Sequence, residues 1–299
     1  MQNTQQNKTW RGKTGGTQGM QETLIRWFRH VDTRLIFPLT FFWVLGSILS
    51  MRTERLASWH YWRRRWGKRP LAACLSLWRQ FYAMSHVVLD RFAAYAGQQF
   101  DIRTDDPTGA MDRLQNGKQG FIILSSHVGN QELAGYSIHS RKPLHILIYL
   151  GDTQTVNRER ERLFAENRLS FLPVEADGSH IFEMHKVLDN GEALSIHGDR
   201  IFSHTRTLTT GLLGAKGVFP EGPFRMAALE RVPVVTMFML RTGHKRYDLR
   251  VRELSRPDDA LLKKDELAEA LLQRYAREID LALHDYPEQW FNFFEFWTE

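Results

Sequence analysis

The feature that most constrains the fold is a short apolar run that ends in a polar turn. Residues 121–125 (FIILS) have the composition of a strand buried in a sheet. The turn that follows carries a histidine, His127, and a glycine, Gly129, and a helical pattern then continues to residue 138. This order predicts a histidine at the carboxyl end of a strand, which is the edge where open α/β sheets bind their ligands.

From residue 98 onward, strand patterns alternate with helix patterns. Strands are predicted at 100–102, 121–125, 144–150, 171–174, 192–197 and 233–240, and helices at 107–116, 153–168, 179–188 and 226–229. Residues 247–252 alternate charged and apolar side chains, which predicts an edge strand, and residues 257–284 predict one amphipathic helix. The alternation predicts an α/β fold with a mainly parallel mixed sheet flanked by helices.

Three regions are predicted: a flexible leader at 1–20, a membrane-associating helical region at 21–97 and an α/β domain at 98–299. Residues 35–51 are uncharged, and as a helix they would span about 25 Å, just short of a hydrocarbon core of about 30 Å. Arginines flank the segment on both sides, which favours a helix or re-entrant wedge held on one face of a membrane. A buried core helix is the alternative.

Residues 59–69 (WHYWRRRWGKR) interleave aromatic rings with cations. Such a segment suits either an anionic membrane surface or single-stranded nucleic acid, and the preceding apolar run favours the membrane. A long helix is predicted from Pro70 to about residue 96. The aromatic tail at 286–297 must cover a core or contact lipid.

The formal net charge of +6 suits nucleic acid, anionic lipid or an acidic protein partner. The single cysteine, Cys74, excludes an internal disulfide and favours a reducing compartment. Metal binding is not expected, because His180 and His185 are five residues apart and so fall on different parts of a helix surface.

The candidate catalytic pair is His127 with Glu132. If Gly129 and Asn130 make the turn, the carboxylate can fold back toward the imidazole, fix one tautomer and stabilise the protonated ring. A structural histidine is the alternative, since the chain has 12 histidines.

Gly129 and Asn130 of the turn are also candidate substrate-binding residues, and two later blocks carry the others. Asp199 and Arg200 follow the strand at 192–197, on the same sheet edge as His127 if the two strands are parallel, and could hold a phosphate or a sugar. Phe219, Pro220, Glu221 and Gly222 precede a small-residue helix, whose N-terminus offers free N–H groups to an anion. The alternatives are an ordinary turn and an ordinary loop-to-helix entry.

Taken in order, the amphiphilic N-terminus, the His-x4-Glu turn, Gly-Asp-Arg, Phe-Pro-Glu-Gly-Pro and a Pro-Glu-Gln-Trp tail resemble the lysophospholipid acyltransferase superfamily. The closest resemblance is to the lipid A lauroyl and myristoyl acyltransferase branch, and within it to predicted relatives found beside aryl polyene pigment genes.

The resemblance implies a membrane-associated O-acyltransferase at the cytoplasmic face of the bacterial inner membrane. It implies His127 as the general base and Glu132 as its orienting partner. Asp199 matches the family's essential aspartate, while Glu221 ranks second because Pro223 stands where glycerolipid enzymes carry a hydroxyl. The family's functional arginine has two candidates here, Arg160 and Arg168.

The implied donor is a thioester of acyl carrier protein or coenzyme A, and the implied acceptor is a lipid or glycolipid hydroxyl. No cofactor, metal or nucleic acid is expected. Two other functions stay open: a thioesterase-like hydrolase that releases free acid, and a non-enzymatic protein that binds a membrane surface or nucleic acid.

Overall fold

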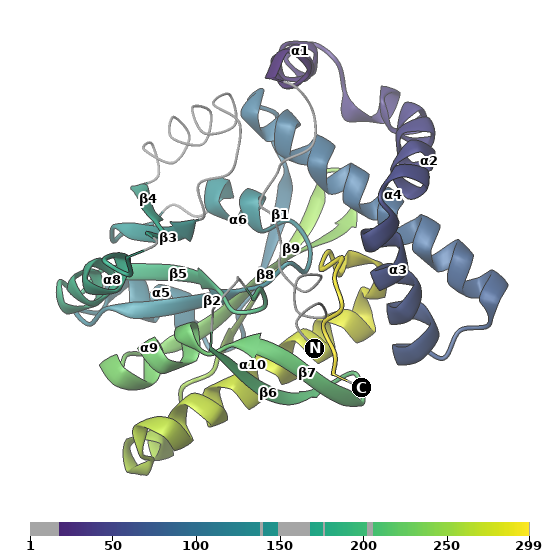
Figure 1. The fold of residues 1–299 in the computed structure, drawn as a ribbon. Coiled ribbons are helices and arrows are strands. Elements are labelled where there is room, and N and C mark those ends of the chain that lie inside the picture. Colours follow the sequence, from purple (N-terminus) through teal and green to yellow (C-terminus); the bar gives the residue numbers. More distant parts are fainter. Residues whose placement is uncertain (1–17, 138–139, 149–167, 176, 202–205, 299) are drawn as a thin grey trace.

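The computed structural model describes residues 18–137, 140–148, 168–175, 177–201 and 206–298 (Figure 1). Its α-helices are α1 Gln18–Phe28, α2 Thr40–Ser50, α3 Arg52–His60, α4 Pro70–Tyr95, α5 Ala110–Asn116, α6 Gln131–Ser137, α8 His180–Asp189, α9 Gly222–Glu230 and α10 Lys264–Asp285. Short 3-10 turns occupy Thr33–Leu35, Phe37–Leu39, Pro257–Leu261 and Pro287–Gln289, and a π-helical turn occupies Tyr61–Arg65. Residues 1–17 of the predicted leader and residues 153–167 of the predicted helix lie outside the described residues.

The strands are β1 Asp101–Asp105, β2 Phe121–Ser125, β3 Leu144–Ile148, β4 Leu169–Pro173, β5 Ala193–His197, β6 Thr207–Leu212, β7 Ala215–Pro220, β8 Val234–Gly243 and β9 Arg246–Glu253. Seven of them form one sheet in the order β1-β9-β8-β2-β5-β3-β4, with every neighbouring pair parallel except β8 and β9. The predicted α/β class with a mainly parallel mixed sheet is therefore confirmed.

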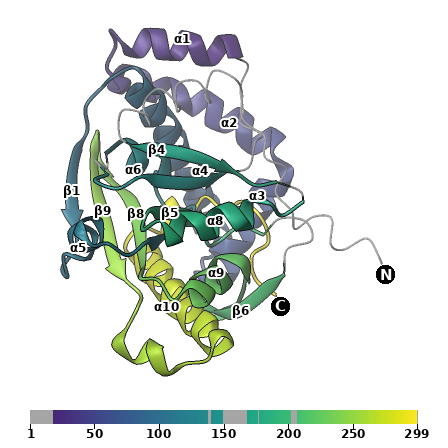
Figure 2. The ribbon, with the colours of Figure 1, turned by 90° about the vertical axis from the view of Figure 1, so that its left-hand side faces the viewer.

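Helices cover both faces of this sheet. Along β2, Phe121 and Ile123 pack with residues of α5 and α6, whereas Ile122 and Leu124 pack with residues of α8, α9 and α10. Because both faces of β2 are buried, its first four residues, Phe121 to Leu124, are all apolar. Figures 1 and 2 show α1 and α2 at the opposite end of the molecule from α10.

The prediction that residues 247–252 form an edge strand is wrong. β9 lies between β8 and β1, and β1 is the edge strand of the sheet. The alternating pattern in β9 arises because one face of the strand is more deeply buried than the other, which says nothing about whether its two edges are paired.

Two further predictions needed correction. No strand was predicted between residues 198 and 232, but residues 207–220 form an antiparallel hairpin of β6 and β7, which ends with Phe219 and Pro220. The predicted helix at 257–284 begins as a separate turn, Pro257–Leu261, before α10. Leu261, expected on the inner side of that helix, is 86% exposed.

The apolar N-terminal segment is not a buried core helix. The segment Thr33–Ser50 is long and apolar enough to cross a membrane by length and composition, but only 22% of it is buried. In α2, the side chains of Phe42 and Leu49 are about 70% exposed. The buried residues of α2 thus form one stripe, on the side that packs on α4.

The aromatic and cationic segment at 59–69 packs partly inside the protein. Tyr61 and Trp62 are buried; Tyr61 stacks on Trp297 and donates its hydroxyl hydrogen to the carbonyl of Pro287 at 2.9 Å. These rings therefore hold the tail, and they are not available to an external surface. The tail covers the core as predicted, with Trp290 and Phe296 fully buried.

Candidate active site

The site arises from the register of two parallel strands. β2 and β5 are neighbours, and Ser125 at the end of β2 pairs with His197 at the end of β5. His127 lies two residues after the end of β2, and Asp199 lies two residues after the end of β5. The register therefore brings together side chains that are 72 positions apart in the sequence.

Asp199 holds His127 with both of its carboxylate oxygens. Oδ1 lies 2.8 Å from Nδ1 of the imidazole, and Oδ2 accepts the backbone N–H of His127 at 2.6 Å. The Nδ2 group of Asn292 donates a third hydrogen bond to Oδ2 at 2.8 Å. A carboxylate facing Nδ1 places the ring proton there, which leaves the lone pair of Nε2 free to take a proton.

The charges of the site suit that role. Burial and the nearby Arg200 guanidinium lower the pKa of His127, although Asp199 opposes them, so the ring is neutral at pH 7. Burial by itself would raise the pKa of Asp199, but His127 and His197 outweigh it and the pKa is lowered. The Asp199 side chain is fully buried and that of His127 is 21% exposed, which gives the imidazole a path to the surface.

The tail builds one wall of this site. The backbone N–H of Phe291 donates to the carbonyl of His127 at 2.8 Å, and the N–H of Gly129 donates to the carbonyl of Gln289 at 3.0 Å. Asn292, which completes the hydrogen bonds of Asp199, was not predicted from the sequence. The aromatic tail indicated only that these residues pack on a core.

Glu132 is not the carboxylate that contacts Nδ1 of His127, although the sequence spacing predicted that role for it. It lies in the first turn of α6, where its carboxylate accepts the hydroxyl hydrogen of Tyr95 and a 3.2 Å ion pair from Arg91. Both of these partners belong to α4. The carboxylate therefore ties α6 to α4, and Asp199 faces Nδ1 of His127.

The other turn residues hold the backbone of the turn. Gly129 has a φ of +74°, and a Cβ atom there would lie 2.1 Å from the carbonyl oxygen of Met239. The Oδ1 atom of Asn130 accepts the N–H of Leu133 at 3.2 Å and so caps α6, while its Nδ2 group donates to the Tyr247 hydroxyl at 3.3 Å. Asn130 is buried, so its contacts are structural.

Arg200 lies beside the pair and also binds the tail. Its Nε and Nη2 groups donate to the side chain of Asn292 and the carbonyl of Phe291 at 3.3 and 3.4 Å. Burial lowers the pKa of Arg200 to about 10, so the guanidinium remains charged at pH 7.

The Phe-Pro-Glu-Gly block lies at the end of β7 and the start of α9. Phe219 packs against the rings of Tyr275 and Phe296, and Glu221 is ion-paired with Arg225 at 2.5 Å. Pro220 is buried and Gly222 is exposed. Within the described part of the chain, no hydrogen bond or ring contact joins these four residues to His127 or Asp199.

His197 is a further member of the site that sequence reasoning missed. Its ring lies edge-to-face against that of His127 with centroids 4.6 Å apart, and its Nδ1 contacts the hydroxyl of Ser125. The signal was available, because His197 immediately precedes Gly198-Asp199 at the same strand end. Gly198 is required there, since a Cβ atom would lie 2.8 Å from the Tyr275 ring.

Of the two candidate arginines, Arg160 lies outside the described residues. Arg168 directly precedes β4, which runs parallel to β3 and through it to β5 and β2. Arg168 therefore lies at the amino-terminal ends of these strands, whereas His127 lies at their carboxyl ends. The Arg168 guanidinium donates to the carbonyl of Arg141 at 3.0 Å.

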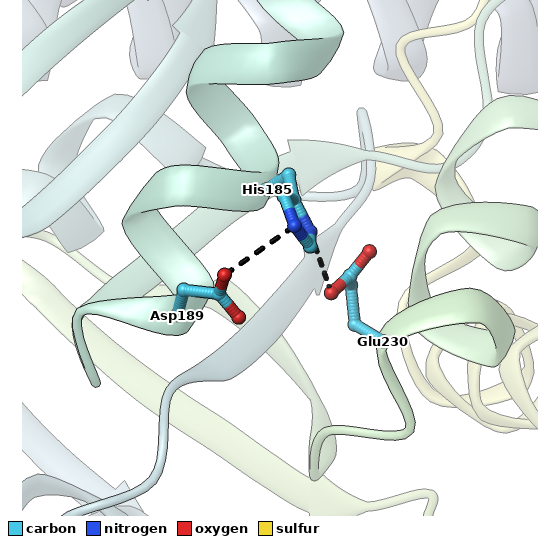
Figure 3. A group of neighbouring side chains, drawn as sticks. All are labelled: His185, Asp189 and Glu230. Carbon is cyan, nitrogen blue, oxygen red and sulfur yellow. Dashed lines mark hydrogen bonds and ion pairs between the residues drawn. The ribbon is translucent and has the colours of Figure 1, made fainter.

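A second cluster of titratable groups lies away from this site, between α8 and α9 (Figure 3). The Nδ1 atom of His185 lies 2.9 Å from Glu230, and Nε2 lies 3.3 Å from Asp189. These are the ligand types of a metal site. Each ring nitrogen faces a carboxylate, and the contact with Glu230 joins α8 to α9.

The family model for bacterial lipid A biosynthesis acyltransferases matches residues 82–299, which include His127, Asp199 and the tail. The chain belongs to this family. A search of curated proteins finds no match. Membership shows that the protein is an acyltransferase of the lipid A type. The match begins within α4, the helix that carries both partners of Glu132.

Proposed function

We propose that this member of the lipid A acyltransferase family transfers a fatty acyl group from a thioester of acyl carrier protein or coenzyme A to a hydroxyl of a lipid or glycolipid. The observation that carries the proposal is the contact between His127 and Asp199. A neutral imidazole with its Nδ1 proton held by a buried carboxylate is the arrangement that general-base catalysis needs.

The reaction is a direct transfer. Nε2 of His127 takes the proton of the acceptor hydroxyl as the oxygen attacks the thioester carbonyl. The tetrahedral intermediate then collapses, the C–S bond breaks, and the imidazolium returns the proton to the leaving thiolate. A positioned general base contributes typically about 10²–10⁴-fold to the rate.

Asp199 orients the ring, and Asn292 orients Asp199. Because Oδ2 already accepts the His127 and Asn292 N–H groups, the carboxylate cannot rotate without breaking hydrogen bonds. Glu132 is a positioning residue in this scheme: it fixes α6, and hence the turn that precedes α6, against α4.

Residues 21–97 form the proposed membrane-associating region, at the cytoplasmic face of the bacterial inner membrane. Within the apolar segment Thr33–Ser50, α2 supplies 11 residues, or about 16 Å of length, and short 3-10 turns make up most of the rest, so the segment is not one continuous α-helix. Its exposed apolar side chains suit a helix that enters one face only. Replacing Phe42 and Leu49 with serine should abolish flotation of the protein with lipid vesicles, whereas the same change at Leu281, an exposed leucine of α10, should not.

The direct test uses the full chain with radiolabelled acyl carrier protein and coenzyme A thioesters, a lipid A precursor as acceptor, and mass spectrometry of the products. His127→Ala should abolish the acylated lipid. The matched control is His145→Ala, because His145 also pairs with a carboxylate, that of Glu192 at 2.7 Å, but lies near the start of β3. Acylated lipid formed equally by wild type and His127→Ala would refute the proposal.

The same assay without acceptor tests the hydrolase alternative. A serine nucleophile is not favoured at Ser125, because that side chain is only 2% exposed and a substrate carbonyl could not reach it. Release of free fatty acid at the same rate with and without acceptor would identify a thioesterase that uses His127 to activate water.

A further inference from the structure

A pocket of about 270 Å³ lies behind the catalytic turn, between α4, the end of β8 and the turn Pro287–Gln289. Its polar lining residues are Arg79, Tyr82, His86, Arg241, Glu288 and Gln289. Gln289 connects it to the active site, because its carbonyl accepts the N–H of Gly129, two residues after His127. The proposed reaction uses none of the other lining residues.

The pocket holds opposite charges apart. Arg79, an exposed side chain, and Glu288, a half-buried one, both line it, and no ion pair joins either of them to another residue in the described ranges. Arg241 has its Nε group bound to buried Asp90 at 3.0 Å. A ligand that carries both charges could form a charge-assisted hydrogen bond with each of these side chains.

A buried polar atom adds to this complementarity. Nε2 of His86 is buried and has no hydrogen-bond partner among the described residues, although a buried polar atom normally has one. Burial and the charge of Arg241 lower the pKa of His86 to about 4, so the ring is neutral at pH 7 and does not repel an ammonium group. It can share one hydrogen bond with a ligand.

The rim of the pocket is apolar and continues into the exposed surface of α2. Phe37 stacks on His86 with ring centroids 4.0 Å apart, and Phe41 of α2 packs on Trp78 of α4 at 4.9 Å. Beyond them lie Phe42 and Trp43, which are 70% and 49% exposed. A polar pocket bordered by an exposed apolar surface suits a molecule with a charged head and an acyl chain.

We propose that this pocket binds the zwitterionic headgroup of a phospholipid, with its phosphate toward Arg79 and Arg241 and its ammonium toward Glu288. The headgroup seats the exposed face of α2 in the bilayer and holds the catalytic turn close to the lipid surface. The site binds lipid without reacting with it, so its test does not depend on acyl transfer.

The experiment measures binding of short-chain dihexanoyl phosphatidylethanolamine and phosphatidylglycerol to the full chain by calorimetry, below the lipids' micelle-forming concentrations. Only the first lipid carries an ammonium. Wild type should bind it about tenfold more tightly, the size of one charge-assisted hydrogen bond in a partly open site. Glu288→Gln should remove this preference by weakening phosphatidylethanolamine binding, while Arg79→Gln should weaken both about tenfold.

Arg277→Gln, at an exposed arginine of α10, is the matched control and should change neither affinity. Thermal unfolding of each variant must match wild type for its affinities to count, and Glu288→Asp supplies a second test, since it keeps the charge and should retain part of the preference. Equal binding of the two lipids by wild type, or an unchanged preference in Glu288→Gln, would overturn the proposal. Equally tight binding of free ethanolamine phosphate or glycine would also overturn it, because the occupant would then be a small soluble zwitterion.

Discussion

Asp199→Asn is the substitution that tests the site most directly. In the wild type, Oδ2 accepts two N–H groups, those of His127 and Asn292, and Oδ1 accepts the Nδ1 proton. An asparagine at position 199 keeps the first two hydrogen bonds only if its oxygen occupies the Oδ2 position. Its NH2 group then faces Nδ1, which must become an acceptor, and the ring proton moves to Nε2. The base is lost although the shape of the site is unchanged.

The size of the effect follows from the alternative orientation. Turning the amide over would restore the active tautomer, but it would point two donors at an NH2 group, at a cost of about 1–3 kcal/mol for each unsatisfied contact. The active tautomer is therefore disfavoured by roughly 2–6 kcal/mol in total. At about 1.4 kcal/mol for each factor of ten, kcat/KM should fall by about 30-fold to 10⁴-fold.

The assay is kcat/KM for acyl transfer, with denaturant unfolding to show that each variant is folded. Glu132→Gln is the decisive comparison, because the local spacing made Glu132 the orienting partner and the structure puts Asp199 there. Glu132→Gln should leave the pH dependence of kcat/KM unchanged and act through stability or KM. A loss in folded Glu132→Gln equal to that in Asp199→Asn, or near-normal activity in Asp199→Asn, would refute the assignment.

Three further predictions concern His127, Gly129 and His86. Because the pKa of His127 is lowered, the midpoint of the fall in kcat/KM on the acid side of the pH–rate profile should lie below pH 6.5. Gly129→Ala should cost about 2–4 kcal/mol of unfolding free energy in urea titrations, whereas Gly67→Ala, at a φ of +60° with open space around it, should cost only about 1 kcal/mol. Because His86 is neutral in the folded protein but gains a proton more readily in the unfolded chain, the free energy of unfolding is highest above pH 6.5 and decreases as the pH falls toward 4. At pH 5 this decrease is at most about 2 kcal/mol, and partial exposure of the ring reduces it to about 1 kcal/mol. Unfolding at pH 7 and pH 5 should show that His86→Phe lacks this loss.

The sheet was predictable because burial on both faces leaves a mark in each strand's own sequence. Residues 121–124 and 237–240 are continuous apolar runs, and both lie in strands of the sheet interior. What the pattern does not report is the neighbour of a strand. β9 has the alternation of an edge strand but lies inside the sheet, and the β6–β7 hairpin was missed because its exposed threonines and glycines have the composition of a loop.

The candidate site shows the same limit at the level of single side chains. Spacing along the chain correctly located His127 at a strand end and Asp199 at another, because each follows a strand that its own residues specify. It could not say which carboxylate faces Nδ1. That depends on the register between β2 and β5, whereas the nearer acid, Glu132, is drawn to Arg91 and Tyr95 of α4.

The tail segment, residues 286–297, both packs on the core and orients the catalytic pair. Trp290 and Phe296 are fully buried and anchor the segment on the core, and between them Asn292 reaches Asp199. The carbonyl of His127 is bound by the same segment through the N–H of Phe291. The residues that seal the core and the residues that orient the base therefore belong to one stretch of backbone. A substitution that loosens its aromatic packing will misalign Asp199 even when it touches neither His127 nor Asp199.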